Sequence, residues 1–244
     1  MKRLLKSSLE HLGINLSLTK NLWYLEPYKL MQRFVTNPNP VIFDIGACDG
    51  YTSKVFNGLF PASKIYAFEP FPDSFALLKA TAGSIENVSA HQYALSNHVG
   101  HTSFFVNKSK ATNSLLPAKN TNSFIDDHVV FENKISVETT TLDNFVEEHH
   151  INVIDILKLD VQGGELMVLE GAKNLLSQHR AKIIYSEIWF IEGYKGQPLY
   201  HDIATYLHQF GYLPFGVYHI HYREDGHQLW GDALFYLPNH EPEQ

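Results

Sequence analysis

The stretch that decides the fold is VIFDIGACDGYTSKVF, residues 41–56. Its first half is an apolar run without polar alternation, which is typical of a strand buried on both faces of a parallel sheet. Glycines at positions 46 and 50 follow, and then a segment with the character of a helix. A strand, a tight glycine turn and a helix N-terminus form a site for a ligand that approaches the backbone closely. The alternative is a simple corner between strand and helix.

The acids of this stretch restrict the kind of ligand. A dinucleotide site requires G-x-G-x-x-G, whereas the chain has Asp44 two residues before Gly46, and Asp49 directly before Gly50. The middle glycine that lets a pyrophosphate approach is missing, and two carboxylates would repel one. A cationic ligand fits better, because Asp44 can hold an ammonium or help to position a sulfonium.

Outside this stretch, strand-like and helix-like segments alternate along the chain. Helices are expected at residues 50–60, 72–82, 142–150, 164–178 and 199–211. Strands are expected at residues 64–70, 88–96, 101–107, 135–142, 153–160, 181–190, 212–222 and 228–237. This alternation predicts one doubly wound α/β domain. The last two strands have no helix between them, so we expect one of them to run antiparallel.

Two segments interrupt the pattern. The turn-forming NPNP at residues 37–40 separates an N-terminal helical extension, residues 1–40, from a single domain, residues 41–244. We expect the basic, amphipathic start of the extension to pack on the domain rather than to contact a membrane. Residues 107–134 are polar and weakly periodic, and a loop of this length is usually functional or mobile.

Composition excludes several function classes. The net charge of -7 is a poor match for nucleic acid. The single cysteine, Cys48, rules out an intrachain disulfide and a cysteine-based zinc cluster, and it suits a reducing compartment. The N-terminus lacks the continuous apolar core of a secretory signal. No segment has the ~18 apolar residues that a membrane span requires. We therefore expect a cytoplasmic protein without a transmembrane segment.

Two further strand ends carry acids. Glu69 ends the second strand, 25 residues after Asp44, and a carboxylate at about this spacing can accept hydrogen bonds from both hydroxyls of a ribose. Asp160 ends an apolar strand at the sheet edge where ligands bind in open α/β folds. A carboxylate there needs a partner, and Lys158 lies two residues earlier on the same face of the strand. Glu165 has a simpler explanation, since an acid is favoured at a helix N-terminus.

Taken together, these motifs resemble the FkbM family of S-adenosylmethionine-dependent methyltransferases. The resemblance runs from about residue 41 to 176, and its most specific part is TLDNF followed by LKLDVQGGELMVLEGA. It implies a class I methyltransferase fold, Rossmann-like, with a seven-stranded, mostly parallel sheet whose last strand is antiparallel. It also implies methyl transfer to oxygen, often on sugars or natural products. The chain departs from the family at Cys48, where Asn is usual, and at Gln162, where Glu is usual.

The resemblance also implies which residues form the site. The methionine end of S-adenosylmethionine would lie against the first turn, and Glu69 would bind the ribose. The end of the third strand would border the adenine. The expected cofactor-binding residues are Asp44, Gly46, Ala47, Cys48, Gly50, Glu69, Pro70, Ala94 and Leu95.

A hydroxyl acceptor benefits from a general base, because positioning carries much of methyl transfer but leaves a proton to remove. Asp160 is the first candidate, and Glu187, which ends the next strand, is the second. These two acids, with Asp232, raise the question of Mg²⁺. We expect no metal site, since no further acid follows IIYSE. His219 and His221 share a strand face and can be a base or a metal pair, but ordinary surface histidines are the simpler interpretation.

The sequence thus predicts an O-methyltransferase that acts on a saccharide hydroxyl or a similar polar metabolite. Two alternatives remain: a methyltransferase for a non-sugar small molecule, and a non-catalytic nucleotide-binding domain of the same fold. A degenerate binder should have lost one of the three acids at positions 44, 69 and 160, and all three are present.

Overall fold

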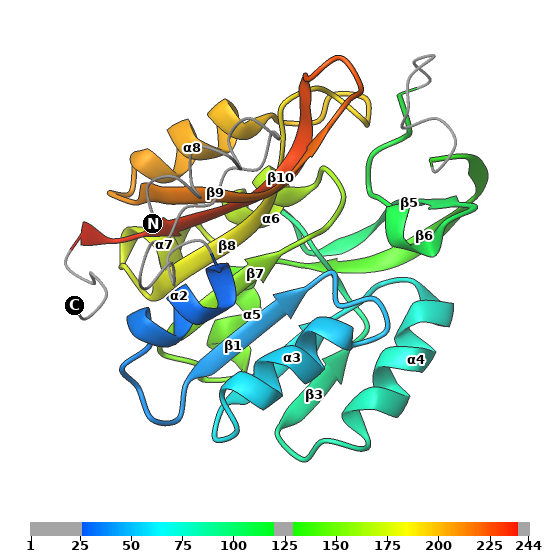
Figure 1. Ribbon diagram of the computed structural model, residues 1–244. Helices are drawn as coiled ribbons and strands as arrows, with labels where there is room; N and C mark the ends of the chain where they lie inside the picture. Colours follow the sequence, from blue (N-terminus) through cyan, green and yellow to red (C-terminus); the bar gives the residue numbers. More distant parts are fainter. Residues whose placement is uncertain (1–25, 120–128, 239–244) are drawn as a thin grey trace, which may run out of the picture.

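The protein is described by a computed structural model that covers residues 26–119 and 129–238, so most of the N-terminal extension lies outside the described residues. Its centre is a seven-stranded sheet in the order β3-β2-β1-β7-β8-β10-β9 (Figure 1). β10 runs antiparallel to both neighbours, whereas the other described pairs of this sheet are parallel. This confirms the expected doubly wound fold. In sheet order, the strands are Val88–His91, Lys64–Phe68, Val41–Ile45, Ile154–Leu159, Ala181–Trp189, Gln228–Tyr236 and Leu213–Tyr222.

Helices cover both faces of this sheet, which explains why its strands lack polar alternation. Neighbouring residues of one strand point to opposite apolar cores. Ile42 packs with α2 (Pro27–Phe34), α3 (Tyr51–Leu59) and α4 (Pro72–Ala82). Phe43 packs in the other core, beneath the helices α5 (Leu142–Glu148), α6 (Glu165–Glu170), α7 (Lys173–Ser177) and α8 (Tyr200–His208).

The segment before the sheet takes part in the first core. Leu30 and Met31 of α2 are fully buried, and Phe34 packs edge-on against Phe215 of β9. Residues 27–34 therefore belong to the same packed body as the strands. Within residues 26–119 and 129–238, no helix is both long and apolar enough to cross a bilayer.

A second, three-stranded sheet in the order β4-β6-β5 projects beyond the large sheet (Figure 1). It consists of β4 (Ala94–Leu95), β6 (Phe131–Thr140) and β5 (Gly100–Asn107). The expected single strand at residues 88–96 is therefore wrong. It is divided between the two sheets, because β4 pairs with β6 rather than with β2. Residues 131–134, expected in a loop, belong to β6.

The single helix expected at residues 164–178 is also wrong. The structure has two short helices, α6 and α7, separated at Gly171. A Cβ atom at Gly171 would lie 2.0 Å from the carbonyl oxygen of Ser96. The helix is interrupted where the backbone after β4 packs against it, and only glycine permits that approach.

Candidate functional site

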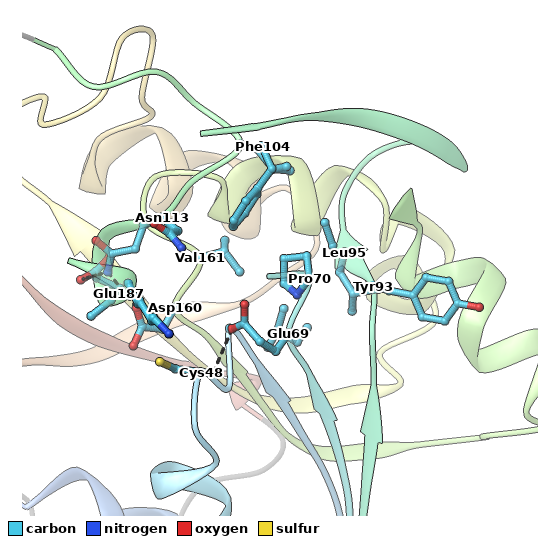
Figure 2. Close-up of a pocket in the computed structure, with 17 residues that line it drawn as sticks. Cys48, Glu69, Pro70, Tyr93, Leu95, Phe104, Asn113, Asp160, Val161 and Glu187 are labelled. Atoms are coloured by element: carbon cyan, nitrogen blue, oxygen red, sulfur yellow. Dashed lines mark hydrogen bonds between the residues drawn. The ribbon is translucent and has the colours of Figure 1, made fainter. Parts of the chain in front are cut away.

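A cavity of about 210 Å³ lies at the carboxyl ends of β1, β2, β7 and β8 (Figure 2). Ligands of open α/β sheets bind at this edge. Eight of the residues expected from the sequence line this one cavity. They are Gly46, Cys48, Glu69, Pro70, Ala94, Leu95, Asp160 and Glu187.

Asp44, expected to face a cationic ligand, does not line the cavity. Its side chain is 0% exposed, its Oδ2 accepts a hydrogen bond of 2.7 Å from Ser53, and its Oδ1 lies 3.1 Å from Nζ of Lys158. The cation that Asp44 binds is therefore the ammonium group of Lys158 and not that of a ligand. Asp44 contributes to the site by fixing Lys158 beneath it.

The glycines of the first turn serve packing within the chain. Gly46 has a φ of 76°, and a Cβ atom there would lie 1.8 Å from the carbonyl oxygen of Asp160. Gly50 has a φ of 85°, and its Cβ would lie 2.8 Å from a methyl group of Thr81 in α4. Only Gly46 of the two lines the cavity, and Ala47 does not line it either. The close approach that we predicted for a ligand is made here by the backbone of Asp160, in the turn that follows β7.

Glu69 joins two turns at the floor of the cavity. Its Oε2 accepts a hydrogen bond of 3.0 Å from the backbone N–H of Cys48 (Figure 2). Its Oε1 accepts one of 2.9 Å from the backbone N–H of Phe71. Glu69 is only 7% exposed. Burial raises its pKa to about 7, although the two N–H donors oppose this. Each carboxylate oxygen retains a second acceptor position, so the group can still accept hydrogen bonds from two ligand hydroxyls.

The opposite wall of the cavity is apolar. Pro70, Ala94 and Leu95 line it together with Tyr93 and Phe104. The sequence motifs did not indicate Tyr93 and Phe104. Phe104 lies in β5, and its distance along the chain from the motifs gave no signal that it would reach the cavity. A flat apolar wall beside a hydrogen-bonding carboxylate suits a planar ring attached to a diol.

Asp160 shares Lys158 with Asp44. The side chain of Asp160 is 43% exposed, and its Oδ2 lies 3.5 Å from the lysine Nζ. Burial lowers the pKa of Lys158, but the carboxylates of Asp44 and Asp160 outweigh it and raise that pKa overall. The lysine therefore stays charged, and it is the partner that the sequence analysis named for Asp160.

Gln162 holds the two candidate acids together. Its Nε2 donates to Asp160 at 3.1 Å and to both oxygens of Glu187 at 3.2 and 3.1 Å. Its Oε1 accepts a hydrogen bond of 3.0 Å from the hydroxyl of Tyr194. An amide is suited to this position because it donates to the acids, whereas a glutamate would add a third carboxylate.

Glu187 is bound on every side by this network. Trp189 Nε1 also donates to its Oε2 at 3.0 Å. Burial raises the pKa of Glu187 well above its usual range, and the charges of Asp160 and Glu165 add to this effect. Both of its oxygens already accept hydrogen bonds from the side chains of Gln162 and Trp189. This arrangement favours a supporting role for Glu187 over that of a base.

Part of the long loop closes the cavity. Lys110, Asn113 and Leu115 line it, next to the short 3₁₀ helix at Lys110–Thr112. Ser114 Oγ donates to the carbonyl of Gln162 at 2.7 Å, and Tyr194 donates to the carbonyl of Thr112 at 2.9 Å. The length of the loop was the signal for this role. Its residues 120–128 lie outside the described part of the chain.

Across the described residues, no group of three or more His, Cys, Asp or Glu side chains is arranged to hold a metal ion. Asp232, considered with Asp160 and Glu187 as a third ligand, is hydrogen-bonded to Tyr185 and His219. Of the aromatic residues after the strand tips, Trp189, Tyr194 and Tyr218 are buried, as packing requires, and Tyr222 is exposed.

A sequence profile described as a methyltransferase FkbM domain matches residues 44–214. The chain belongs to the FkbM methyltransferase family. This confirms the resemblance drawn from the motifs, and with it the methyltransferase class. The match covers both turns and every residue of the cavity named above.

Curated relatives are methyltransferases as well. The chain is 31% identical over 180 residues to the 2-O-methyltransferase NoeI of Sinorhizobium fredii, which covers 71% of this chain and 73% of that protein. It is 28% identical over 137 residues to the hexuronic acid methyltransferase AglP of Haloferax volcanii. That match covers 56% of this chain and about half, 51%, of AglP.

The fold is shared with a solved member of the family. The crystal structure of Methyltransferase FkbM from Methylobacillus flagellatus matches with a TM-score of 0.51 at 15% identity. It covers 82% of this chain and 44% of that one. At this identity the likeness shows the fold alone: the class I methyltransferase arrangement with the last strand antiparallel.

Proposed function

We propose that the protein transfers the methyl group of S-adenosylmethionine to a hydroxyl group of a saccharide or a similar polar metabolite. The family membership supports this proposal, together with one relative named as a 2-O-methyltransferase and another named as a hexuronic acid methyltransferase. The observation that carries it is the cavity, in which a carboxylate able to accept from a diol faces an apolar wall.

The residues of the cavity fit this cofactor. Glu69 would hold the ribose hydroxyls, while Ala94 and Leu95, with Pro70, would border the adenine. The backbone of the turn from Gly46 to Cys48 would lie along the methionine end. When bound, the cofactor supplies an electrophilic methyl group on a sulfonium. A negatively charged rim suits that cation better than it suits a pyrophosphate.

Asp160 would stand at the reacting end. Methyl transfer is an in-line displacement, so much of the acceleration comes from holding the acceptor oxygen in line with the methyl carbon. The Asp160 carboxylate is partly exposed and is fixed by Lys158 and Gln162. We assign it to orient the acceptor hydroxyl and to stabilise the positive charge beside it. Glu187 supports this position through Gln162.

The proposed reaction needs no metal ion, and we expect it to take place in the cytoplasm. We expect no requirement for Mg²⁺, because an amide donor from Gln162, not a third acid, stands between Asp160 and Glu187. The single cysteine favours a reducing compartment, the cytoplasm. The net charge of -7 disfavours a nucleic-acid acceptor.

Calorimetry with S-adenosylmethionine tests the cofactor assignment. We expect binding to the wild type, and binding about tenfold weaker or worse in Glu69→Ala, since hydrogen bonds to a charged group contribute ~1.5–3 kcal/mol. Glu86→Ala is the matched control, because Glu86 is an exposed glutamate away from the cavity. No binding to the wild type would refute the proposal.

The acceptor is identified by labelled methyl transfer into a polar extract of the source organism. A labelled methyl ether on a saccharide is the expected product. A labelled non-sugar metabolite would point to the first alternative. Cofactor binding without any transfer would point to the second, a non-catalytic domain.

A further inference from the structure

A β-bulge lies between β9 and β10, near the site. Trp230 pairs with His221, and Asp232 pairs with Tyr218, so three steps along β9 oppose two along β10. His219, inside the bulge, has a φ of 47°, in the left-handed region that residues other than glycine rarely adopt. Bulges often re-aim a side chain next to an active site, and backbone strain of this kind calls for a functional explanation.

β10, the strand opposite the bulge, has a glycine where the two strands come closest. A Cβ atom at Gly231 would lie 2.8 Å from the carbonyl oxygen of Tyr218 and 3.2 Å from the Cα of Ile220. Only glycine permits β10 to pass so close to the bulged strand. The bulge is therefore supported by residues on both strands.

The bulge brings His219 to Asp232. In a regular strand, the residue next to Tyr218 would point to the opposite face from Tyr218 and from its partner Asp232. Instead, Nδ1 of His219 lies 2.8 Å from Oδ2 of Asp232. The hydroxyl of Tyr185, from β8, donates to the same oxygen at 2.7 Å. An ionised carboxylate can only accept, so we assign the proton to Nδ1, which leaves Nε2 as the accepting nitrogen of the neutral ring.

This pair continues the row of acids at the sheet edge. Asp232 is the direct cross-strand partner of Glu187, and such partners share a face with Cβ atoms ~5 Å apart. Burial raises the pKa of Asp232, with a contribution from the charge of Asp160. The titratable groups around the pair are Tyr28 of α2, Tyr185, Asp160 and Glu187. The side chain of His219 is 51% exposed, so an acceptor can reach it.

We propose that His219, oriented by Asp232 and Tyr185, is the general base that takes the proton from the acceptor hydroxyl. This inference rests on the proposed function. The O–H bond breaks as its proton moves to Nε2, and the acceptor oxygen forms a bond to the methyl carbon. The S–C bond breaks, and its electron pair stays on sulfur as a neutral thioether. The imidazolium then releases its proton to water.

The acids nearer to the cavity are less suited to this step. Asp160 is already ion-paired with Lys158 and accepts a hydrogen bond from Gln162. Glu187 is buried and is held by Gln162 and Trp189. His219 offers an exposed imidazole, the side chain most often used as a general base, and Asp232 is placed to stabilise the imidazolium that forms. Asp232 and Tyr185 are positioning residues.

The test compares His219→Asn with the control His221→Asn. Asparagine tolerates a positive φ, so the first variant keeps the bulge while it removes the base. His221 lies on the same strand and stacks on Trp230, with ring centroids 4.5 Å apart. For each protein, the rate of labelled methyl transfer into the polar extract is measured from about pH 6 to pH 9, and S-adenosylmethionine binding is measured by calorimetry.

We expect His219→Asn to lower the rate by about 100-fold or more, as for loss of a general base, with cofactor affinity within about twofold of wild type. The fall in rate at acidic pH should disappear in this variant and persist in His221→Asn. Asp232→Asn should lower the rate less. Nitrogen NMR of the wild type, with His219 assigned by difference, should show the proton on Nδ1.

Two outcomes would overturn the inference, and they differ from failure of the proposed function. An active wild type with an unchanged rate and pH profile in His219→Asn would refute the role of His219 alone. A proton on Nε2 in the wild type would do the same. If the wild type binds no cofactor or transfers no label, the proposed function fails, and this inference fails with it.

Discussion

The turn that follows β1 and the turn that follows β7 carry the same ingredients, an acid and two glycines, but place them differently. Asp44 lies inside β1, is 0% exposed and pairs with Lys158. Asp160 lies just beyond the end of β7, is 43% exposed and uses the same lysine. The first acid is part of the core, and the second faces the cavity.

Sheet register explains the difference. Asp44 pairs with Lys158 across the parallel strands, and Asp160 follows two residues later. Asp44, within β1, is covered by the helices on that face, whereas Asp160, one step past the end of β7, reaches the ligand edge. The role of a strand-end carboxylate therefore depends on where the strand stops, which a motif alone does not give.

The largest expected effect tests the glycines of the two turns. Gly46→Ala would place a Cβ 1.8 Å from the backbone oxygen of Asp160, so we expect a loss of about 4 kcal/mol or more in the free energy of unfolding. Gly163→Ala meets only the flexible side chain of Gln197 at 3.2 Å, and its positive φ should cost ~1–2 kcal/mol. Urea unfolding measures both, with Gly58→Ala, in open space, as the control. Equal losses would contradict the comparison.

The second test exchanges the acids. Asp44→Asn leaves buried Lys158 with a single carboxylate, so we expect a stability loss of about 3 kcal/mol. Asp160→Asn should cost less than about 1 kcal/mol, since its pair is partly exposed. Its methyl-transfer rate should nevertheless fall about 100-fold. Urea unfolding and labelled transfer separate the two effects. A stability loss larger in Asp160→Asn would reverse the assignment.

The third test concerns Glu165, which follows the second turn. Burial raises its pKa to about 7, against hydrogen bonds from Val161 and Gly163. The folded protein thus keeps a proton that the unfolded chain loses at lower pH, so the stability from this group is present at about pH 5 and is lost as the pH rises through 7.

Glu165→Gln lacks this titration while its amide oxygen can accept the same two hydrogen bonds. Relative to the wild type, we expect the variant to gain on the order of 2 kcal/mol between about pH 5 and pH 8. Urea unfolding of both proteins at each pH gives the difference, in which contributions from groups that do not interact with Glu165 cancel. A difference that is independent of pH would show that Glu165 titrates normally.

The smallest expected effect concerns the non-glycine residues with positive φ, one in each turn: Cys48 at 50° and Gln162 at 56°. Asparagine adopts this conformation more readily than cysteine, which gives a physical reason for the asparagine usual in the family. We expect Cys48→Asn to raise the unfolding free energy by about 0.5 kcal/mol, and Cys48→Ser to give no gain. Thermal unfolding measures this, and a loss in Cys48→Asn would show that the thiol packing matters more.

Much of the fold followed from local sequence. The apolar runs without alternation identified the strands of the large sheet, and the missing helix between β9 and β10 identified the antiparallel strand. The division of residues 88–96 depended on the pairing of β4 with β6, and that of residues 164–178 on the contact between Gly171 and Ser96. Long-range approaches of this kind leave no local pattern.

The site followed the same rule. Acids and glycines at strand ends were found because their positions in the fold determine where they meet. Phe104 and Asn113 reach the cavity from outside the large sheet, and no spacing in the sequence indicates this. We expected Asp44 to face the ligand, but its side chain is buried and does not line the cavity. A sequence does not show how far a helix covers a strand.

The contact between Gly46 and the backbone of Asp160 also constrains how the family can diversify. With Asp160 N–H donating to the carbonyl of Ile45 at 3.0 Å, the two turns are interlocked and neither can change shape alone. Changes in the shape of the cavity are then easier in residues 110–119, which line it and meet the turn after β7 through a side chain, the Ser114 hydroxyl on the carbonyl of Gln162. Substitutions in either turn should therefore disturb both turns, whereas substitutions in residues 110–119 should disturb the cavity alone.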